Sequence, residues 1–178
     1  MQHARDAILF VHLIAVAIFF MTLGVEALAV MNLAKRPAVD VAQTWLSPLR
    51  GAVSLDQYAL VALFLTGGYL INGLATQGEK MGFLVTLLLF FVIGGLTGMA
   101  GGRYRKLQRL IDSGGSPAEI QERMAAPMIQ SALRMRIVLL AAVLLLVSLK
   151  TDLMKSLIIF GVFLVIGIAA SFPKRQSV

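Results

Sequence analysis

Two ionisable side chains lie deep within one apolar stretch of the sequence, and their types could do chemistry. His12 and Glu26 both fall in the first such stretch. Charges in the hydrocarbon core of a membrane are costly, so intramembrane ionisable residues often mark functional sites. A helix turns once every 3.6 residues, which places these two on nearly the same face and about 21 Å apart along the axis. The spacing therefore predicts two separate sites.

His12 is the residue through which a cofactor could bind. An imidazole nitrogen can ligate haem or another metal, or contact a quinone in a membrane redox protein. The only other histidine, His3, stands at the N-terminus, so haem would have His12 as its single axial ligand or a methionine as the second one. The alternative is a histidine that faces the bundle and forms a hydrogen bond with a neighbour. The cofactor stays open, with haem b as one option.

Glu26 has three interpretations. It could relay protons in a small proton-linked transporter, bind a cation, or form an ion pair with a basic residue such as Arg50 or Arg103. We prefer the ion pair. Without a partner, burial would favour the neutral form of the carboxyl group.

Several kinds of catalytic and metal site are missing from the sequence. There is no cysteine, which excludes disulfides and thiolate ligands, and two histidines cannot supply a zinc-protease motif. A phosphate-binding glycine loop and paired deep carboxylates are also missing. We therefore assign no catalytic residue and no metal site, and an ordinary hydrolase or nucleotide-driven pump is disfavoured.

The composition is that of a membrane protein. Hydrophobic residues make up 58% of the 178 residues and charged residues 14%, and the mean hydropathy is +0.85. A single soluble core of this size could not bury so much apolar surface. The net charge of +7 comes from basic residues between the apolar runs. They are expected to contact lipid head groups rather than nucleic acid, because no basic patch is interleaved with aromatic residues.

Five apolar runs are long enough to cross a bilayer, which takes about 20 residues in a helix. The sequence therefore predicts an all-α, polytopic membrane helix bundle forming a single domain over residues 1–178. Cytoplasmic loops are expected at 34–57 and 102–130. The predicted spans are 7–33, 58–75, 81–101, 131–149 and 156–172.

The positions of lysine and arginine predict the orientation. With the N-terminus outside, twelve of the sixteen fall on inside segments. This bias towards the inside predicts an N-out, C-in protein of the bacterial inner (cytoplasmic) membrane. In the first inner loop, Trp45 suggests a helix on the membrane surface, and an irregular linker is the alternative. In the second, the residues from Ser116 to Glu119 form a helix-start pattern, and the helix should be interrupted near Pro127.

Small and polar residues in the second and third spans predict close helix packing. Gly94, Gly98 and Gly102 recur every four residues, a spacing typical of helices that approach closely. The pattern does not separate packing within the chain from packing against another protein. The second span adds two further glycines and two polar residues that can bond across helices, namely Gly67, Gly68, Tyr69 and Asn72.

Three segments carry a resemblance to other proteins. They are the first helix with its His12, Glu26 and Lys35-Arg36, the Leu65–Tyr69 segment, and the hairpin Leu149–Ser156. In these the chain resembles a family of small bacterial integral membrane proteins, which implies a fold and no activity. It is more distantly similar to HemJ-type protoporphyrinogen oxidases, which also carry a histidine in the first helix. Only His12 can be matched to that family.

The leading hypothesis from the sequence is a non-catalytic role. Glycine-lined packing faces and few reactive groups favour an accessory or assembly subunit of a larger, energy-converting membrane complex, respiratory or photosynthetic. Its expected partners are the lipid bilayer and other integral membrane subunits. The alternatives are a haem- or quinone-binding redox protein using His12 and a proton-linked transporter using Glu26.

Overall fold

The computed structural model describes residues 2–74, 76–124 and 126–172, and these form six helices. Five of them are long and apolar enough to cross a membrane, so the predicted polytopic helix bundle is confirmed. The predicted end of the second span, Ala75, lies outside the described residues. The helices are α1 (Gln2–Leu33), α2 (Val39–Leu74), α3 (Gln77–Asp112), α4 (Pro117–Met124), α5 (Pro127–Leu149) and α6 (Leu153–Ser171).

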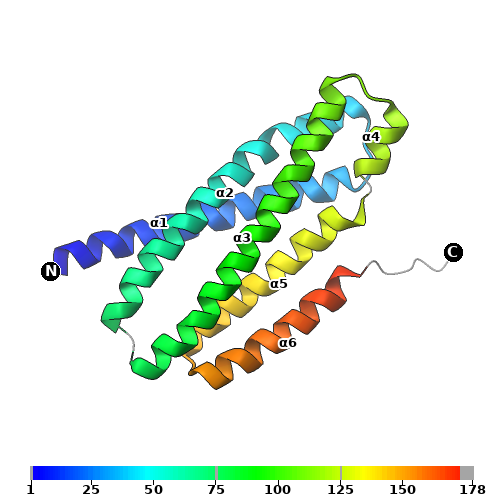
Figure 1. Ribbon diagram of the computed structural model, residues 1–178. Coiled ribbons are helices and arrows are strands. Elements are labelled where there is room, and N and C mark those ends of the chain that lie inside the picture. Colours follow the sequence, from blue (N-terminus) through cyan, green and yellow to red (C-terminus); the bar gives the residue numbers. More distant parts are fainter. Residues whose placement is uncertain (1, 75, 125, 173–178) are drawn as a thin grey trace.

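The long helices run up and down along the bundle (Figure 1). Helices α1 and α2 form an antiparallel pair, and α3 packs beside α2, α5 and α6. The start of α1 lies at the same end as the α2–α3 and α5–α6 connections, here called the amino end. The short α4 lies at the opposite end. Lysine and arginine are frequent in the segments there, 35–36 and 103–123, so it is here called the basic end.

Helix α2 is much longer than predicted. Residues 34–57, expected to form a loop, are helical from Val39 onward, and the helix continues through Pro48. Ala42, Leu46 and Leu49 are buried at spacings of three or four residues, so this segment has an apolar stripe of its own that packs in the core. At roughly 1.5 Å per residue, α2 spans about 54 Å, well beyond the hydrocarbon core of about 30 Å.

The segment 102–130 is also largely helical. It contains the last turns of α3, all of α4 and the start of α5. Helix α3 ends before Gly114, whose φ of +72° suits a residue without a Cβ atom. The predicted helix start is confirmed, because the Ser116 hydroxyl accepts the backbone N–H of Glu119 at 3.3 Å. Helix α5 begins at Pro127, where the interruption was expected.

The glycine series of α3 lies partly against α2. A Cβ atom at Gly94 would meet Leu60 at 3.8 Å, and one at Gly98 would meet Gln57 at 3.9 Å, whereas Gly102 has open space around it. The closest helix contacts occur at other glycines. A Cβ atom at Gly82 would collide with the backbone of the α5–α6 connection, whereas at Gly101 and Gly167 it would meet the side chains of Val53 and Met135.

Helix α6 is held to α5 at both of its ends. At the amino end, Lys150 adopts a left-handed conformation with φ of +47°, and the Asp152 carboxylate caps α6 by accepting the N–H of Lys155 at 3.0 Å. At the basic end, the Ser131 hydroxyl donates to the carbonyl of Ser171 at 2.8 Å. These contacts fix α6 as the outer wall beside α3 and α5.

Candidate functional site

A cavity of about 370 Å³ lies between α1, α2, α3 and α5 in the amino half of the bundle. This volume falls within the usual range of small-molecule pockets. Its wall is almost entirely apolar, and five phenylalanine rings contribute to it, namely Phe19, Phe20, Phe64, Phe83 and Phe90.

The cavity opens sideways between α1 and α5. Leu9 on α1 and Leu144 and Val147 on α5 line it, yet each is 45–56% exposed on the bundle surface. Both helices are long and apolar enough to cross a membrane, so exposed apolar side chains on them are expected to face lipid. A lipid-soluble molecule could therefore enter the cavity from within the bilayer.

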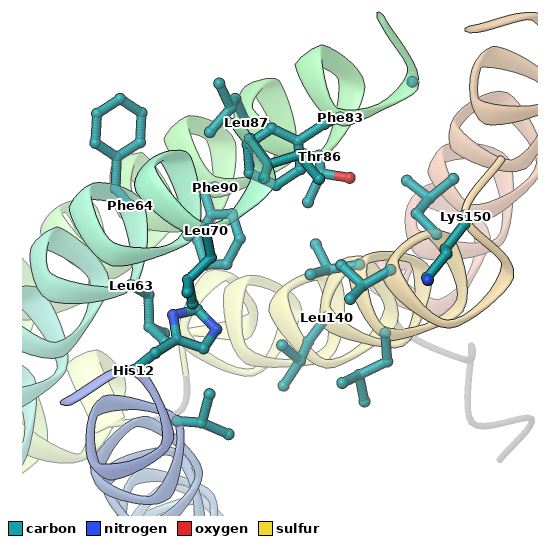
Figure 2. Close-up of a pocket in the computed structure, with 18 of the residues that line it drawn as sticks. His12, Leu63, Phe64, Leu70, Phe83, Thr86, Leu87, Phe90, Leu140 and Lys150 are labelled. Carbon is teal, nitrogen blue, oxygen red and sulfur yellow. The ribbon is translucent and has the colours of Figure 1, made fainter. Parts of the chain in front are cut away.

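His12 on α1 is a polar group of this wall, and one of its ring nitrogens has a partner. Its Nδ1 lies 2.8 Å from the Thr66 hydroxyl, which itself donates to the carbonyl of Ala62 at 2.5 Å. While the single hydrogen of the Thr66 hydroxyl is donated to the carbonyl of Ala62, Nδ1 is the donor towards Thr66. In the neutral ring, Nε2 then keeps its lone pair. Figure 2 shows this nitrogen directed into the cavity.

Further polar groups lie across the cavity from His12, near its amino end. Figure 2 shows the ammonium of Lys150 turned towards the cavity and the hydroxyl of Thr86 on the α3 wall. Glu79 and Thr151 complete the lining at this end. The cavity thus offers a hydrogen-bond acceptor, His12 Nε2, and a charged donor, Lys150, on different sides of an apolar space.

A second polar group, here called the ion cluster, lies in the basic half between the same helices. It consists of Glu26 on α1, Asp56 on α2 and Arg136 on α5, whose side chains are at most 3% exposed. Arg136 Nη1 donates to Glu26 Oε2, and its Nη2 donates to Asp56 Oδ2 at 2.7 Å. The hydroxyl of Tyr104 on α3 donates to Glu26 Oε1 at 2.9 Å. Four helices therefore meet in one hydrogen-bonded group.

Two threonines complete the ion cluster around Asp56. The Thr22 hydroxyl lies 3.1 Å from Oδ1 and also 2.9 Å from the carbonyl of Phe19. The Thr97 hydroxyl lies 3.1 Å from Oδ2 and 3.0 Å from the carbonyl of Ile93. Each threonine thus has a carboxylate and a backbone oxygen competing for its single hydrogen.

The ion cluster lies one to two helical turns from the cavity along the helices that the two sites share. Phe19, which lines the cavity, precedes Thr22 by three positions, and Leu140 follows Arg136 by four. Both sites therefore share the same helices, with a layer of apolar side chains between them.

The structure separates His12 from Glu26, as their spacing predicts. The partner of Glu26 is Arg136, not Arg50 or Arg103, so the preferred ion pair exists with a different residue. Sequence reasoning missed Asp56, because residues 34–57 were interpreted as a loop. Its position three residues after the buried Val53 and four before the buried Leu60 is the signal that could have found it.

The remaining predicted site residues lie outside both sites, with one exception. Tyr69 is 52% exposed, and Asn72 donates to the carbonyl of Gly68 on its own helix, so neither bonds across helices in the described interactions. Gly67 is the exception, because it lines the cavity within reach of His12 and Phe83. Among the described residues, no group of three or more His, Asp or Glu side chains could hold a metal ion.

The chain matches no protein-family model, no curated protein and no solved structure. The resemblance to small bacterial membrane proteins and to HemJ-type oxidases stays a prediction.

Proposed function

We propose that the protein binds a lipid-soluble quinol, a dihydroxy aromatic ring with an apolar tail, in the cavity beside His12. The observation that carries this proposal is the position of His12 on the wall of an apolar cavity, with Nδ1 next to the Thr66 hydroxyl and the other ring nitrogen directed into the cavity. A ring hydroxyl of the quinol donates to Nε2. The phenylalanine rings of the wall supply flat apolar surfaces on which an aromatic head group packs.

The opposite wall supports the same ligand. The Lys150 ammonium is a donor for the second ring oxygen, on the far side of the cavity from His12. The lateral opening between α1 and α5 lets the apolar tail stay among lipid chains while the head enters. This arrangement, with a few placed polar groups in an apolar pocket, is that of specific small-molecule sites.

The test is a binding titration of the purified full-length protein in detergent with a short-chain ubiquinol, followed by calorimetry. The expected result is saturable binding that the substitution His12→Phe weakens by about tenfold, as expected for one hydrogen bond of roughly 1.4 kcal/mol. His3→Phe is the matched control, because His3 is exposed on the same helix outside the cavity. That variant should bind like the unaltered protein.

Three results would count against quinol binding. They are no saturable binding, equal binding by the His12→Phe variant, and a Soret absorbance band in the purified protein. The last would identify haem as the ligand, held by His12 Nε2 with Thr66 orienting the ring.

The accessory-subunit hypothesis stays a prediction. The hypothesis rests on the glycine series of α3. Gly94 and Gly98 pack against α2, so these two glycines need no partner protein to explain them. The bacterial inner membrane and the N-out, C-in orientation are likewise proposals, and both rest on the distribution of lysine and arginine.

A further inference from the structure

The ion cluster contains more negative than positive charge. Two carboxylates, Glu26 and Asp56, face the single guanidinium of Arg136, and all three are buried in a bundle that lipid surrounds. Fully ionised, the cluster has a net charge of −1. An uncompensated charge in such surroundings is strongly unfavourable, and the usual response of a carboxylate is to take up a proton.

No second cation balances the cluster within the part of the chain that the structure describes. The groups that contact it are Glu26 and Thr22 from α1, Tyr104 and Thr97 from α3, and Arg136 from α5, with Asp56 itself on α2. Arg136 is the one positive group among them. The Nε of this arginine has no hydrogen-bond partner, so the guanidinium is not engaged elsewhere.

Glu26 is the carboxylate that suits the ionised form. Its Oε2 accepts from the guanidinium of Arg136, which can only donate, and its Oε1 accepts from the phenol of Tyr104, which has no other acceptor among the described interactions. Hydrogen bonds to a charged acceptor are the stronger ones and favour the charged state. Glu26 and Arg136 therefore form the permanent ion pair of the cluster.

Asp56 is the carboxylate that can hold a proton. Its Oδ2 receives Arg136 at 2.7 Å, which leaves Oδ1 with Thr22 as its hydrogen-bond partner at 3.1 Å. When the Thr22 hydroxyl donates to the carbonyl of Phe19, its oxygen is free to accept from a protonated Oδ1. When it rotates towards Asp56, it becomes the donor to an ionised Oδ1. Thr22 thus has a suitable arrangement for either state.

We propose that the ion cluster is a binding site for one proton, held on Asp56 Oδ1 and donated to the Thr22 hydroxyl. Uptake of the proton makes the cluster neutral, and its release turns the Thr22 hydroxyl from Phe19 to the carboxylate. A metal cation is a poorer occupant, because Arg136 and the surrounding hydroxyl groups already take the carboxylate oxygens. The proposal is independent of the ligand in the cavity.

Infrared spectroscopy of the full-length protein in lipid nanodiscs at neutral pH tests the proton directly. The expected signal is one C=O stretching band of a protonated carboxylic acid that shifts in D₂O. Asp56→Asn should abolish it. Glu26→Gln should also abolish it, because Arg136 then faces a single carboxylate, which stays ionised. Asp40→Asn, at an exposed residue of the same helix as Asp56, should leave the band unchanged.

Two further variants decide which carboxylate holds the proton, and both retain every charge of the cluster. Thr22→Val should shift the band, because it removes the hydroxyl next to Asp56, whereas Tyr104→Phe should leave its position unchanged. The reverse pattern places the proton on Glu26 and overturns the assignment. A missing band in the unaltered protein overturns the proton site. Loss of the band on adding sodium chloride at constant pH identifies a metal cation instead and overturns it as well.

Discussion

The cavity and the ion cluster lie between the same four helices, yet they are built in opposite ways. The cavity is apolar and has a histidine with one ring nitrogen directed into it, whereas the ion cluster is buried and its charges are largely paired. A site that must admit a molecule needs space and an unused polar atom. A site that joins helices needs neither. Substitutions in the ion cluster are therefore expected to change the stability of the protein, and substitutions in the cavity to change ligand binding.

The largest expected effect is on the stability of the ion cluster. Arg136→Met removes the one cation that the described residues place in the cluster and leaves two buried carboxylates, which should lower the free energy of unfolding by about 3–5 kcal/mol. Thermal unfolding in detergent measures the loss. Arg134→Met is the control, because Arg134 is exposed and donates one long hydrogen bond to Ala170 at 3.4 Å. Similar losses in both variants would mean that the cluster is not a main support of the bundle.

The next effect concerns the helix contact at the amino end of the cavity. Gly82→Ala places a Cβ atom against the backbone carbonyl of Thr151, which cannot move away as a flexible side chain could. The expected cost is about 1–3 kcal/mol, typical of overpacking. Gly95→Ala, where nothing lies within 4 Å, should be close to neutral in the same unfolding measurement. If Gly82→Ala leaves the free energy of unfolding unchanged, the backbone of the α5–α6 connection can move aside at little cost.

The third effect is on ligand binding in the cavity, and it is tested by a substitution at Gly67. Gly67→Leu would extend from a position 3.5 Å from His12 into the cavity, and it should weaken binding of a short-chain ubiquinol by at least about tenfold. The adjacent Gly68 has open space around it, so Gly68→Leu is the matched control. Equal affinities of the two variants, measured by calorimetry, would contradict a ligand in this cavity.

The smallest effect is a dependence on pH at the exposed cap of α6. The backbone N–H of Lys155, followed by its side chain, keeps the pKa of Asp152 below the ordinary value of 3.8. Because the folded pKa is the lower one, the cap stabilises α6 fully above the ordinary pKa and loses this contribution as the pH falls through the folded value. Asp152→Asn keeps a capping side chain without the charge.

The measurement is thermal unfolding of both proteins in detergent between neutral and strongly acidic pH. The unfolding temperature of the Asp152→Asn variant should lie slightly below that of the unaltered protein at neutral pH. This difference in unfolding temperature should become smaller below pH 4. A difference that widens on acidification would give the opposite sign and contradict the assignment.

The sequence predicted the elements better than the site. Five apolar runs were enough to predict a membrane helix bundle, because a bilayer requires such runs and hydropathy reports them directly. His12 and Glu26 stood out, since each interrupts an apolar stretch. Asp56 and Arg136 did not stand out, because they lie near the ends of apolar runs, where charges are ordinary, and only the extension of α2 and the packing of α5 bury them. That Arg136 is the partner depends on tertiary packing across 110 residues, which periodicity does not encode.

The ion cluster also has a consequence for the order of biosynthesis. Its two carboxylates belong to α1 and α2, whereas its arginine arrives with α5, after α3 and α4 have been made. Chains emerge from the ribosome N-terminus first. A nascent chain that has inserted its first three helices therefore contains both acids without their cation, and a chain truncated before Pro127 never acquires it. Completion of the fourth apolar helix is thus the step at which the newly made protein can become a stable bundle.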